Sequence, residues 1–236
     1  MSNSYFQFKQ FTIHHDRCAM KVGTDGVLLG AWGQLPKQGK VLDIGTGTGL
    51  IALMAAQRAP KATITAIDID PQAVKQAREN VDSSPFASRV EVFESSLLQF
   101  ARNHVHLFDA ILCNPPFFEE QLLPPNLSRS AARHTHSLPF EELIPTVSTL
   151  LSSSAPFSVI LPTMAFAGFR QLCFQYGLTL SRLCHIQTTP LKPPKRVLAT
   201  FVKGSFENIE ETQMILNNGT HRSDDYAALT RDFYLW

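Results

Sequence analysis

The sequence lacks the features that mark secreted, membrane-spanning and disulfide-rich proteins. Four cysteines stand far apart, without a CxxC pair or a short Cys/His spacing: Cys18, Cys113, Cys173 and Cys184. The first residues have neither a basic start nor an apolar core of the kind found in signal peptides. Such cysteines therefore predict reduced thiols and a cytoplasmic protein. No apolar run is long enough for a membrane-spanning helix, so we expect no membrane partner.

An excess of charge of one sign is also missing. The chain carries 21 Lys and Arg against 20 Asp and Glu, a net charge of +1. Binding to a polyanion would therefore depend on a local group of basic residues, not on the whole surface. Repeats and low-complexity segments are absent, and 236 residues with 44% hydrophobic content suffice for one large domain. The oligomeric state is open, with a monomer as the default.

Short apolar runs alternate with amphipathic stretches along most of the chain. Buried strands are predicted at residues 41–44, 63–67, 89–93, 107–113, 157–161, 179–188 and 197–202. Helical patterns lie between most of them. This alternation predicts an α/β fold: a doubly wound, mostly parallel, seven-stranded Rossmann-like sheet with helices on both faces.

The first of these strands leads into a glycine-rich turn. Asp43 is followed by Gly45, Gly47 and Gly49, which permit a tight turn and a close approach of a ligand to the backbone. Asp43 would repel a pyrophosphate and would instead hold an amino group or a bridging water. The next strand ends at Asp68, whose carboxylate is placed to accept from two ribose hydroxyls. These residues predict a ligand that is a nucleoside with a cationic amino-acid tail.

A second motif, Asn114-Pro115-Pro116-Phe117, follows the predicted strand at 107–113. Ligands of open α/β sheets bind at the carboxyl ends of the strands. The prolines lack N–H donors and stiffen the chain, so its carbonyls stay free to accept, and the Asn114 amide oxygen is another acceptor. Two acceptors beside the Phe117 ring suit a planar base with an exocyclic NH2 group. A strand-end turn with a core phenylalanine is the alternative for the motif alone.

The chain offers four basic residues as candidate phosphate contacts: Arg129, Arg133, Lys195 and Arg196. The first two lie in a long polar loop, about residues 119–137, and loops of this length are usually functional or disordered. The other two lie in a proline-containing turn at 192–196, which is either a phosphate contact or a solvated hairpin. His134 and His136 alternate in the long loop without further ligands at a known spacing, so no metal site is predicted.

An N-terminal helix is predicted from residue 24, with Thr24 or Asp25 as its N-cap. The N-terminus of a helix favours an anion such as a carboxylate. A capped amphipathic helix without a ligand is the simpler interpretation of this stretch.

Together, residues 41–49, Asp68 and the motif from Asn114 resemble the class I S-adenosylmethionine-dependent methyltransferases that modify amino groups. Residues 8–11, 15–26 and 226–234 narrow the resemblance. They are similar to a bacterial family, the tRNA1(Val) adenine-N6 methyltransferases, which act on adenine 37 beside the anticodon. The likeness covers nearly the whole chain. It implies one methyltransferase domain over residues 1–236, with a flap and helix at 1–33 and a C-terminal extension at 205–236 packed on it.

The resemblance also implies S-adenosylmethionine as cofactor and tRNA as partner. Gly45, Gly47 and Gly49 would line the methionine end of the cofactor, and Asp68 would hold its ribose. The motif from Asn114 to Phe117 would hold the target base, with Asn114 also beside the cofactor.

Three further residues are assigned to the cofactor by the same resemblance. Lys21 and Thr24 fall in the element that approaches its tail. Ser96 aligns with an acidic residue that usually touches its adenine, a departure from the family pattern.

In the implied mechanism, Asn114 and the Pro115 carbonyl accept both protons of the adenine N6 group. The nitrogen lone pair then points at the methyl group, and catalysis is mainly alignment. The same motif also suits enzymes that methylate guanine N2 in ribosomal RNA, adenine N6 in DNA, or a glutamine amide in a protein. A non-catalytic subunit with a cofactor-binding fold is a further alternative.

Overall fold

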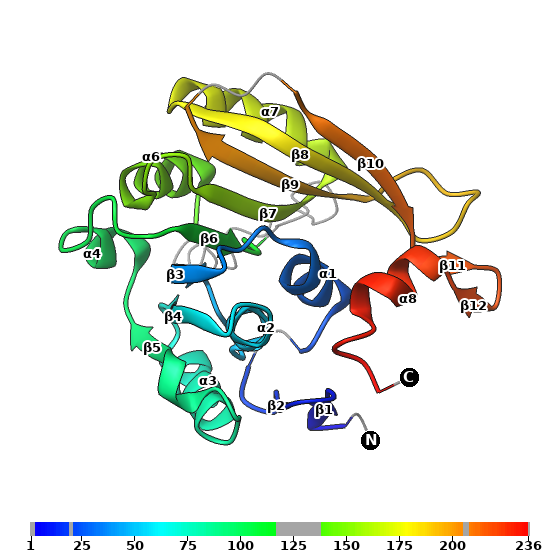
Figure 1. Ribbon diagram of the computed structural model, residues 1–236, viewed down its shortest axis with the longest axis horizontal. Coiled ribbons are helices and arrows are strands. Elements are labelled where there is room, and N and C mark those ends of the chain that lie inside the picture. Colours follow the sequence, from blue (N-terminus) through cyan, green and yellow to red (C-terminus); the bar gives the residue numbers. More distant parts are fainter. Residues whose placement is uncertain (1–2, 19–20, 117–137, 205–207, 236) are drawn as a thin grey trace, which may run out of the picture.

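A computed structural model describes residues 3–18, 21–116, 138–204 and 208–235 (Figure 1). Its central sheet contains β3 (Gln38–Ile44), β4 (Lys61–Asp68), β5 (Val90–Glu94), β6 (Ala110–Cys113), β7 (Pro156–Pro162), β8 (Leu178–Gln187), β9 (Arg196–Lys203) and β10 (Glu210–Ile215). The strand order is β10-β8-β9-β7-β6-β3-β4-β5. β9 alone runs antiparallel to its neighbours, β7 and β8, and every other pairing in this sheet is parallel.

The predicted fold class is confirmed, but the prediction of seven strands is wrong, because the described residues form a sheet of eight. The additional strand, β10, pairs in parallel with β8 at the edge of the sheet. Its first four residues are exposed and none of its residues is fully buried. An edge strand of this kind lacks the apolar alternation by which strands are recognised in a sequence.

Helices cover both faces of the sheet, which explains why its central strands are apolar on both sides. One face is covered by α1 (Thr24–Trp32), α2 (Leu50–Arg58), α3 (Pro71–Asp82) and α8 (Asp224–Thr230). The other face is covered by α4 (Leu97–Ala101), α6 (Phe140–Leu150) and α7 (Thr163–Gln175). Along β3, for example, Val41 belongs to the first core, and Leu42 and Ile44 belong to the second.

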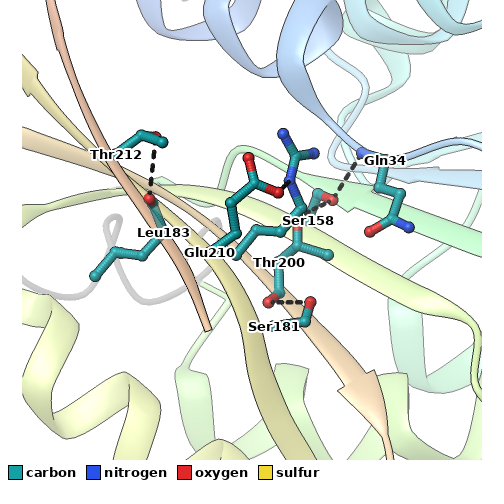
Figure 2. Close-up of polar contacts among 8 residues, drawn as sticks. Gln34, Ser158, Ser181, Leu183, Thr200, Glu210 and Thr212 are labelled. Carbon is teal, nitrogen blue, oxygen red and sulfur yellow. Dashed lines mark hydrogen bonds and ion pairs between the residues drawn. The ribbon is translucent and has the colours of Figure 1, made fainter. Parts of the chain in front are cut away.

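Buried hydroxyl groups join the strands of the antiparallel part of the sheet (Figure 2). The Ser158 and Thr200 hydroxyls lie 2.9 Å apart across β7 and β9, and Ser181 Oγ donates to the Thr200 carbonyl at 3.0 Å. At the edge, the Arg182 guanidinium pairs with Glu210 at 3.1 Å. β10 is attached to β8 by a parallel backbone ladder and by this ion pair.

The N-terminal hairpin, β1 (Tyr5–Gln7) and β2 (Thr12–His14), packs against the C-terminal residues. The Phe8 and Tyr234 rings stack with centroids 5.9 Å apart, and Phe6 meets the same tyrosine edge-on at 5.8 Å. The backbone N–H of Lys9 donates to the Phe233 carbonyl at 2.7 Å. After β10, a small hairpin of β11 (Asn217–Asn218) and β12 (His221–Arg222) leads into α8. Both chain ends therefore meet on the α1 side of the sheet, as Figure 1 shows.

Candidate active site

The strand register brings the two sequence motifs together. Ile44 at the end of β3 lies opposite Ile67 of β4 on one side and Cys113 of β6 on the other. The residues that follow, Asp68 and Asn114, therefore leave the sheet on either side of the turn that begins at Gly45. The chain passes from β3 outward through β4 and β5, and later outward from β6 through β7. Such a reversal of winding opens a crevice at the carboxyl ends of the strands.

The glycine turn presents open backbone to this crevice. Gly45, Gly47 and Gly49 have φ values of +69°, +55° and +83°, which side chains with a Cβ rarely adopt. A Cβ built at Gly45 or Gly47 would meet no atom within 4 Å. At these two positions glycine permits the backbone conformation of the turn and leaves open space that a ligand can fill. The predicted close approach of a ligand to the backbone fits this geometry.

Asp43 is fully buried beneath the turn. Thr46 Oγ1 donates to its Oδ2 at 2.6 Å, while Oδ1 has no hydrogen-bond partner among the described residues. Burial, with a smaller contribution from the charge of Asp68, raises the pKa of the Asp43 carboxyl to about 7. A buried carboxylate oxygen without a donor is costly. The site thus fits a ligand that brings a positively charged donor, such as the amino group of S-adenosylmethionine.

Asp68 has a second task that its position in the sequence did not predict. Its Oδ2 accepts from the backbone N–H of Gly47 at 2.8 Å, and its Oδ1 accepts from that of Asp70 at 2.9 Å. Each carboxylate oxygen has two acceptor positions, so one on each oxygen is left for a ribose hydroxyl. Asp68 therefore closes the glycine turn and keeps the acceptor capacity that was predicted for it.

The proline motif follows β6 directly. Asn114 is half-buried, Pro115 is buried and Pro116 is exposed. Phe117 lies outside the described residues, as do Arg129, Arg133, His134 and His136. The predicted contacts of Phe117 with a base and of the two arginines with phosphate therefore stay predictions.

The N-terminus of α1 differs from the prediction. Its N-cap is Gly23, in an extended conformation and without a side-chain cap, so the prediction of Thr24 or Asp25 is wrong. Both residues lie in the first turn, and the Asp25 carboxylate accepts from Arg196 Nε at 2.9 Å. A negative charge in the first turn suits the helix dipole, which explains why Asp25 works there without capping. Lys21 and Thr24 are exposed at this end of the helix.

Ser96, predicted to replace an acidic contact to the cofactor adenine, is the N-cap of α4. Its Oγ accepts from the backbone N–H of Gln99 at 3.2 Å, and the Gln99 side chain accepts from the Ser96 N–H at 3.5 Å. This capping box gives Ser96 a structural role beside the predicted one. A neighbouring residue was overlooked: Ile69, directly after Asp68, is 51% exposed at the end of β4. The sequence indicated this residue by placing an apolar side chain between Asp68 and Asp70, at the end of a predicted strand.

Asn80, a buried residue of α3, was also overlooked. It is 1% exposed, and its Nδ2 donates to the carbonyls of His14 and Thr48, both at 2.9 Å. Its Oδ1 accepts from the His14 N–H at 2.9 Å. One side chain thus ties the N-terminal hairpin to the glycine turn. The signal in the sequence was a polar residue beside the buried Val81, on an apolar helix face.

After His14, which Asn80 binds, the N-terminal segment runs along α3 toward Asp68. The Arg17 N–H donates to Gln76 Oε1 at 3.3 Å, and the Arg17 guanidinium pairs with Glu79. Burial, and then the charges of Asp68, Asp70 and Asp16, raise the pKa of the Cys18 thiol to about 11. Cys18 therefore lies at the Asp68 side of the site as a protonated thiol.

Of the two basic residues predicted at the turn after β8, one already has a partner. Lys195 is exposed, while Arg196 forms the ion pair with Asp25 described above. The turn reaches the end of β7, because the backbone N–H of Thr163 donates to the Lys195 carbonyl at 3.1 Å. Both residues thus lie at the edge of the sheet that carries Asn114.

The described part of the chain has neither a metal-binding cluster nor a membrane-spanning helix. No three His, Cys, Asp or Glu residues gather there in a way that could hold a metal ion. None of its helices combines the length and apolar character needed to cross a bilayer.

Comparisons with known proteins identify the family. A family model described as "Methyltransferase small domain" matches residues 23–135. A protein of Phocaeicola vulgatus, named tRNA1(Val) (adenine(37)-N6)-methyltransferase, is 48% identical over 236 residues, 100% of this chain and 99% of its own. Proteins of the same name from Bacteroides fragilis strain YCH46 (100% of this chain, 99% of theirs) and Pseudoalteromonas translucida (98% and 99%) are 46% and 44% identical. The chain belongs to the tRNA1(Val) (adenine(37)-N6)-methyltransferase family. The family predicted from the sequence is confirmed, and the protein is a methyltransferase.

Solved structures support the fold of this family member. A predicted O-methyltransferase from Agrobacterium tumefaciens has a TM-score of 0.70 at 20% identity, over 89% of this chain and 96% of its own. The Pyrococcus horikoshii protein TYW2, solved in complex with MeSAdo, has a TM-score of 0.60 at 16% identity, over 86% of this chain and 73% of its own. At these identities the likeness establishes the Rossmann-like methyltransferase fold alone.

Proposed function

We propose that this protein transfers the methyl group of S-adenosylmethionine to N6 of adenine 37 in tRNA1(Val). The observation that carries the proposal is the register that brings Asn114 and Gly45 to adjacent strand ends. One motif suits an exocyclic amino group and the other suits a nucleoside cofactor, so donor and acceptor meet in one crevice. The name shared by full-length relatives supports the choice of tRNA.

The described residues fit the cofactor. Asp43 has an unpaired buried oxygen for the amino group, Gly45 and Gly47 leave open space, and Asp68 retains acceptor positions for the ribose. When bound, S-adenosylmethionine supplies an electrophilic methyl group on a sulfonium. Exposed Ile69 offers an apolar surface for the adenine ring, beside the predicted contact at Ser96.

Asn114 and Pro115 orient the target amino group by accepting hydrogen bonds from it. The Asn114 side-chain oxygen and the Pro115 carbonyl each take a hydrogen bond from the target amino group. This turns the nitrogen lone pair out of the ring plane and toward the methyl group. Positioning of this kind contributes about 7–11 kcal/mol to catalysis. Phe117 is proposed, from the sequence motif, to stack on the base for about 1–3 kcal/mol.

The protein as a whole is proposed to work as one unit over residues 1–236, in the cytoplasm. Its N-terminal flap and helix and its C-terminal extension belong to that unit, as the contact between Phe8 and Tyr234 suggests.

The test is methylation of tRNA with labelled S-adenosylmethionine, followed by nucleoside analysis and mapping of the label. We expect N6-methyladenosine at position 37 of tRNA1(Val) and no label in ribosomal RNA, DNA or protein. N2-methylguanosine, or label in protein, would contradict the proposal. No label in any substrate would favour a non-catalytic subunit.

Asn114→Ala is the sharpest variant for the mechanism. It removes an acceptor that matters most in the transition state, so kcat should fall on the order of a hundred-fold or more. Cofactor affinity and the KM for tRNA should stay close to wild type. Single-turnover assays at saturating cofactor give the rate, and wild-type turnover would refute the role of Asn114.

A further inference from the structure

The turn between β8 and β9, residues 188–195, carries an unusual surface. Leu191 at its tip is 98% exposed, and Met164, one residue after the contact at Thr163, is 83% exposed. Lys192 and Lys195 are exposed in the same turn. A single exposed apolar side chain needs no explanation. In this turn an exposed leucine lies close along the chain to two exposed lysines, at the edge of the sheet that carries the active site, so the turn has both apolar and cationic character.

This turn is held stiffly despite its exposure. It contains Pro190, Pro193 and Pro194, which fix φ at three positions. The Lys192 N–H donates to the Thr189 carbonyl at 3.1 Å, and Gln187 Nε2 donates to the Lys192 carbonyl at 2.7 Å.

The base of the turn is tied to neighbouring elements. Thr163 Oγ1 donates to the Pro194 carbonyl at 3.0 Å, which joins the turn to α7. The Lys195 N–H donates to the Ile186 carbonyl at 3.0 Å. A side chain displayed on a stiff turn loses little entropy when it binds, so this Leu191 is well suited to make a contact.

Sheet geometry places the turn within reach of a substrate in the active site. Cys113 pairs with Val159, which pairs with Ala199, so Asn114 is level with Leu198 two strands away. Lys195 lies three residues beyond that level. Strand spacing and rise put it about 10 Å to the side and about 10 Å outward from Asn114. A single-stranded nucleic acid covers that distance in a few nucleotides.

We infer that the β8–β9 turn is a tRNA-contacting arm, in which Leu191 packs on unstacked bases while Lys192 and Lys195 contact phosphates. The inference rests on the proposed function. Single-stranded RNA presents flat apolar base faces next to a line of negative charge, which this surface complements. A protein partner would be the other candidate, but the combination of exposed lysines with an apolar tip favours RNA.

In this arm Arg196 is a positioning residue. Its Nε binds Asp25 at 2.9 Å, and both side chains are about one-third exposed, at 33% and 31%. The ion pair joins the base of the arm to the first turn of α1, across 171 positions of the sequence. Arg196 therefore holds the arm beside the active site, and its phosphate contact stays a prediction.

The test compares tRNA binding of three variants as a function of salt concentration. Leu191→Ser should raise the Kd for tRNA about five- to ten-fold without changing the salt slope, because the lost contact is apolar. Replacing Lys192 and Lys195 with Ala should reduce the slope by about one to two. Phe174→Ser is the matched control. This residue is 75% exposed near the other end of α7, so binding should match wild type.

Two further variants separate anchor from phosphate contact. Arg196→Gln and Asp25→Asn should raise the KM for tRNA to a similar degree, because each breaks the same ion pair. If Arg196→Gln alone lowers the salt slope, Arg196 meets a phosphate and its assignment as anchor is wrong. Cofactor affinity should be unchanged in Leu191→Ser and in the lysine variant.

Wild-type tRNA affinity in Leu191→Ser would overturn the inference, while methylation by the wild-type protein would leave the proposed function intact. Loss of tRNA binding equally in Phe174→Ser would also overturn it, since the effect would not be local. Failure of the wild-type protein to methylate tRNA at all would instead refute the proposed function.

Discussion

Asp43 gives the active site a dependence on pH that begins with one buried carboxyl group. Its pKa is raised to about 7, so the neutral form is favoured in the folded protein and the ionised form in the unfolded chain. Its stabilising contribution is therefore complete below about pH 4 and is lost as pH rises to about 7. Over this range the thermal unfolding midpoint of the wild type should fall relative to that of Asp43→Asn.

Binding of S-adenosylmethionine should follow the opposite trend. Its amino group pairs best with an ionised Asp43, so affinity should rise as pH passes through about 7. Calorimetric titrations at several pH values measure this trend. The same rise in Asp43→Asn would show that another group is responsible.

Asp68 supports two different measurements, because its carboxylate serves both the turn and the proposed ribose contact. Asp68→Ala should lower cofactor affinity by about 1.5–3 kcal/mol, the usual contribution of hydrogen bonds to a charged group. It should also lower the unfolding midpoint, since the N–H groups of Gly47 and Asp70 lose their acceptor. Asp68→Asn keeps one acceptor oxygen, so its cofactor affinity and its unfolding midpoint should lie between those of the wild type and of Asp68→Ala. Unchanged affinity in the alanine variant would remove Asp68 from the site.

At the scale of elements, Asn80 couples the N-terminal hairpin to the glycine turn. Asn80→Ala removes the bonds to both His14 and Thr48, so the turn loses a support and the KM for S-adenosylmethionine should rise several-fold. The kcat should change less, because Asn114 is untouched. Gln76→Ala is the control: Gln76 is equally buried and binds the Arg17 N–H of the N-terminal segment but not the turn. Equal KM values in both variants would show that the link to the turn does not matter.

The elements that could be predicted are those whose signal is local. The glycine turn could be predicted because positive φ values require glycine, and α3 could be predicted from the apolar spacing of its buried face. The helix α2 follows from a continuous run of apolar residues after the turn. β10 was missed because it is a mostly exposed edge strand, held by its backbone ladder with β8 and by polar contacts such as Arg182–Glu210.

The unpredicted parts of the candidate site depend on tertiary contacts. Arg196 meets Asp25, and Asn80 meets Thr48, only because the fold brings distant segments together. The spacing of residues along the sequence does not predict either pair. The same holds for the backbone contacts of Asp68, although its location at a strand end was predicted.

At the scale of the whole molecule, Tyr234 joins the two ends of the chain. Its ring is buried and stacks on Phe8. Its hydroxyl oxygen lies 3.2 Å from the Tyr226 hydroxyl oxygen. Tyr234→Ala should therefore destabilise the protein by about 3–5 kcal/mol, as expected for a large buried aromatic residue. Tyr234→Phe keeps the ring and should cost only about 1 kcal/mol. Urea unfolding measures both, and equal stability of the alanine variant and the wild type would contradict the packing.

The meeting of the chain ends also has a consequence for biosynthesis. Phe6 and Phe8 are synthesised more than two hundred residues before their partner Tyr234. At 5–20 residues per second, Tyr234 is synthesised roughly 10–45 s after these two phenylalanines, which lack this packing partner until then. During that time the N-terminal hairpin presents an apolar surface to the cell's chaperones. The hairpin that Asn80 ties to the glycine turn is therefore covered only after Tyr234 has been synthesised.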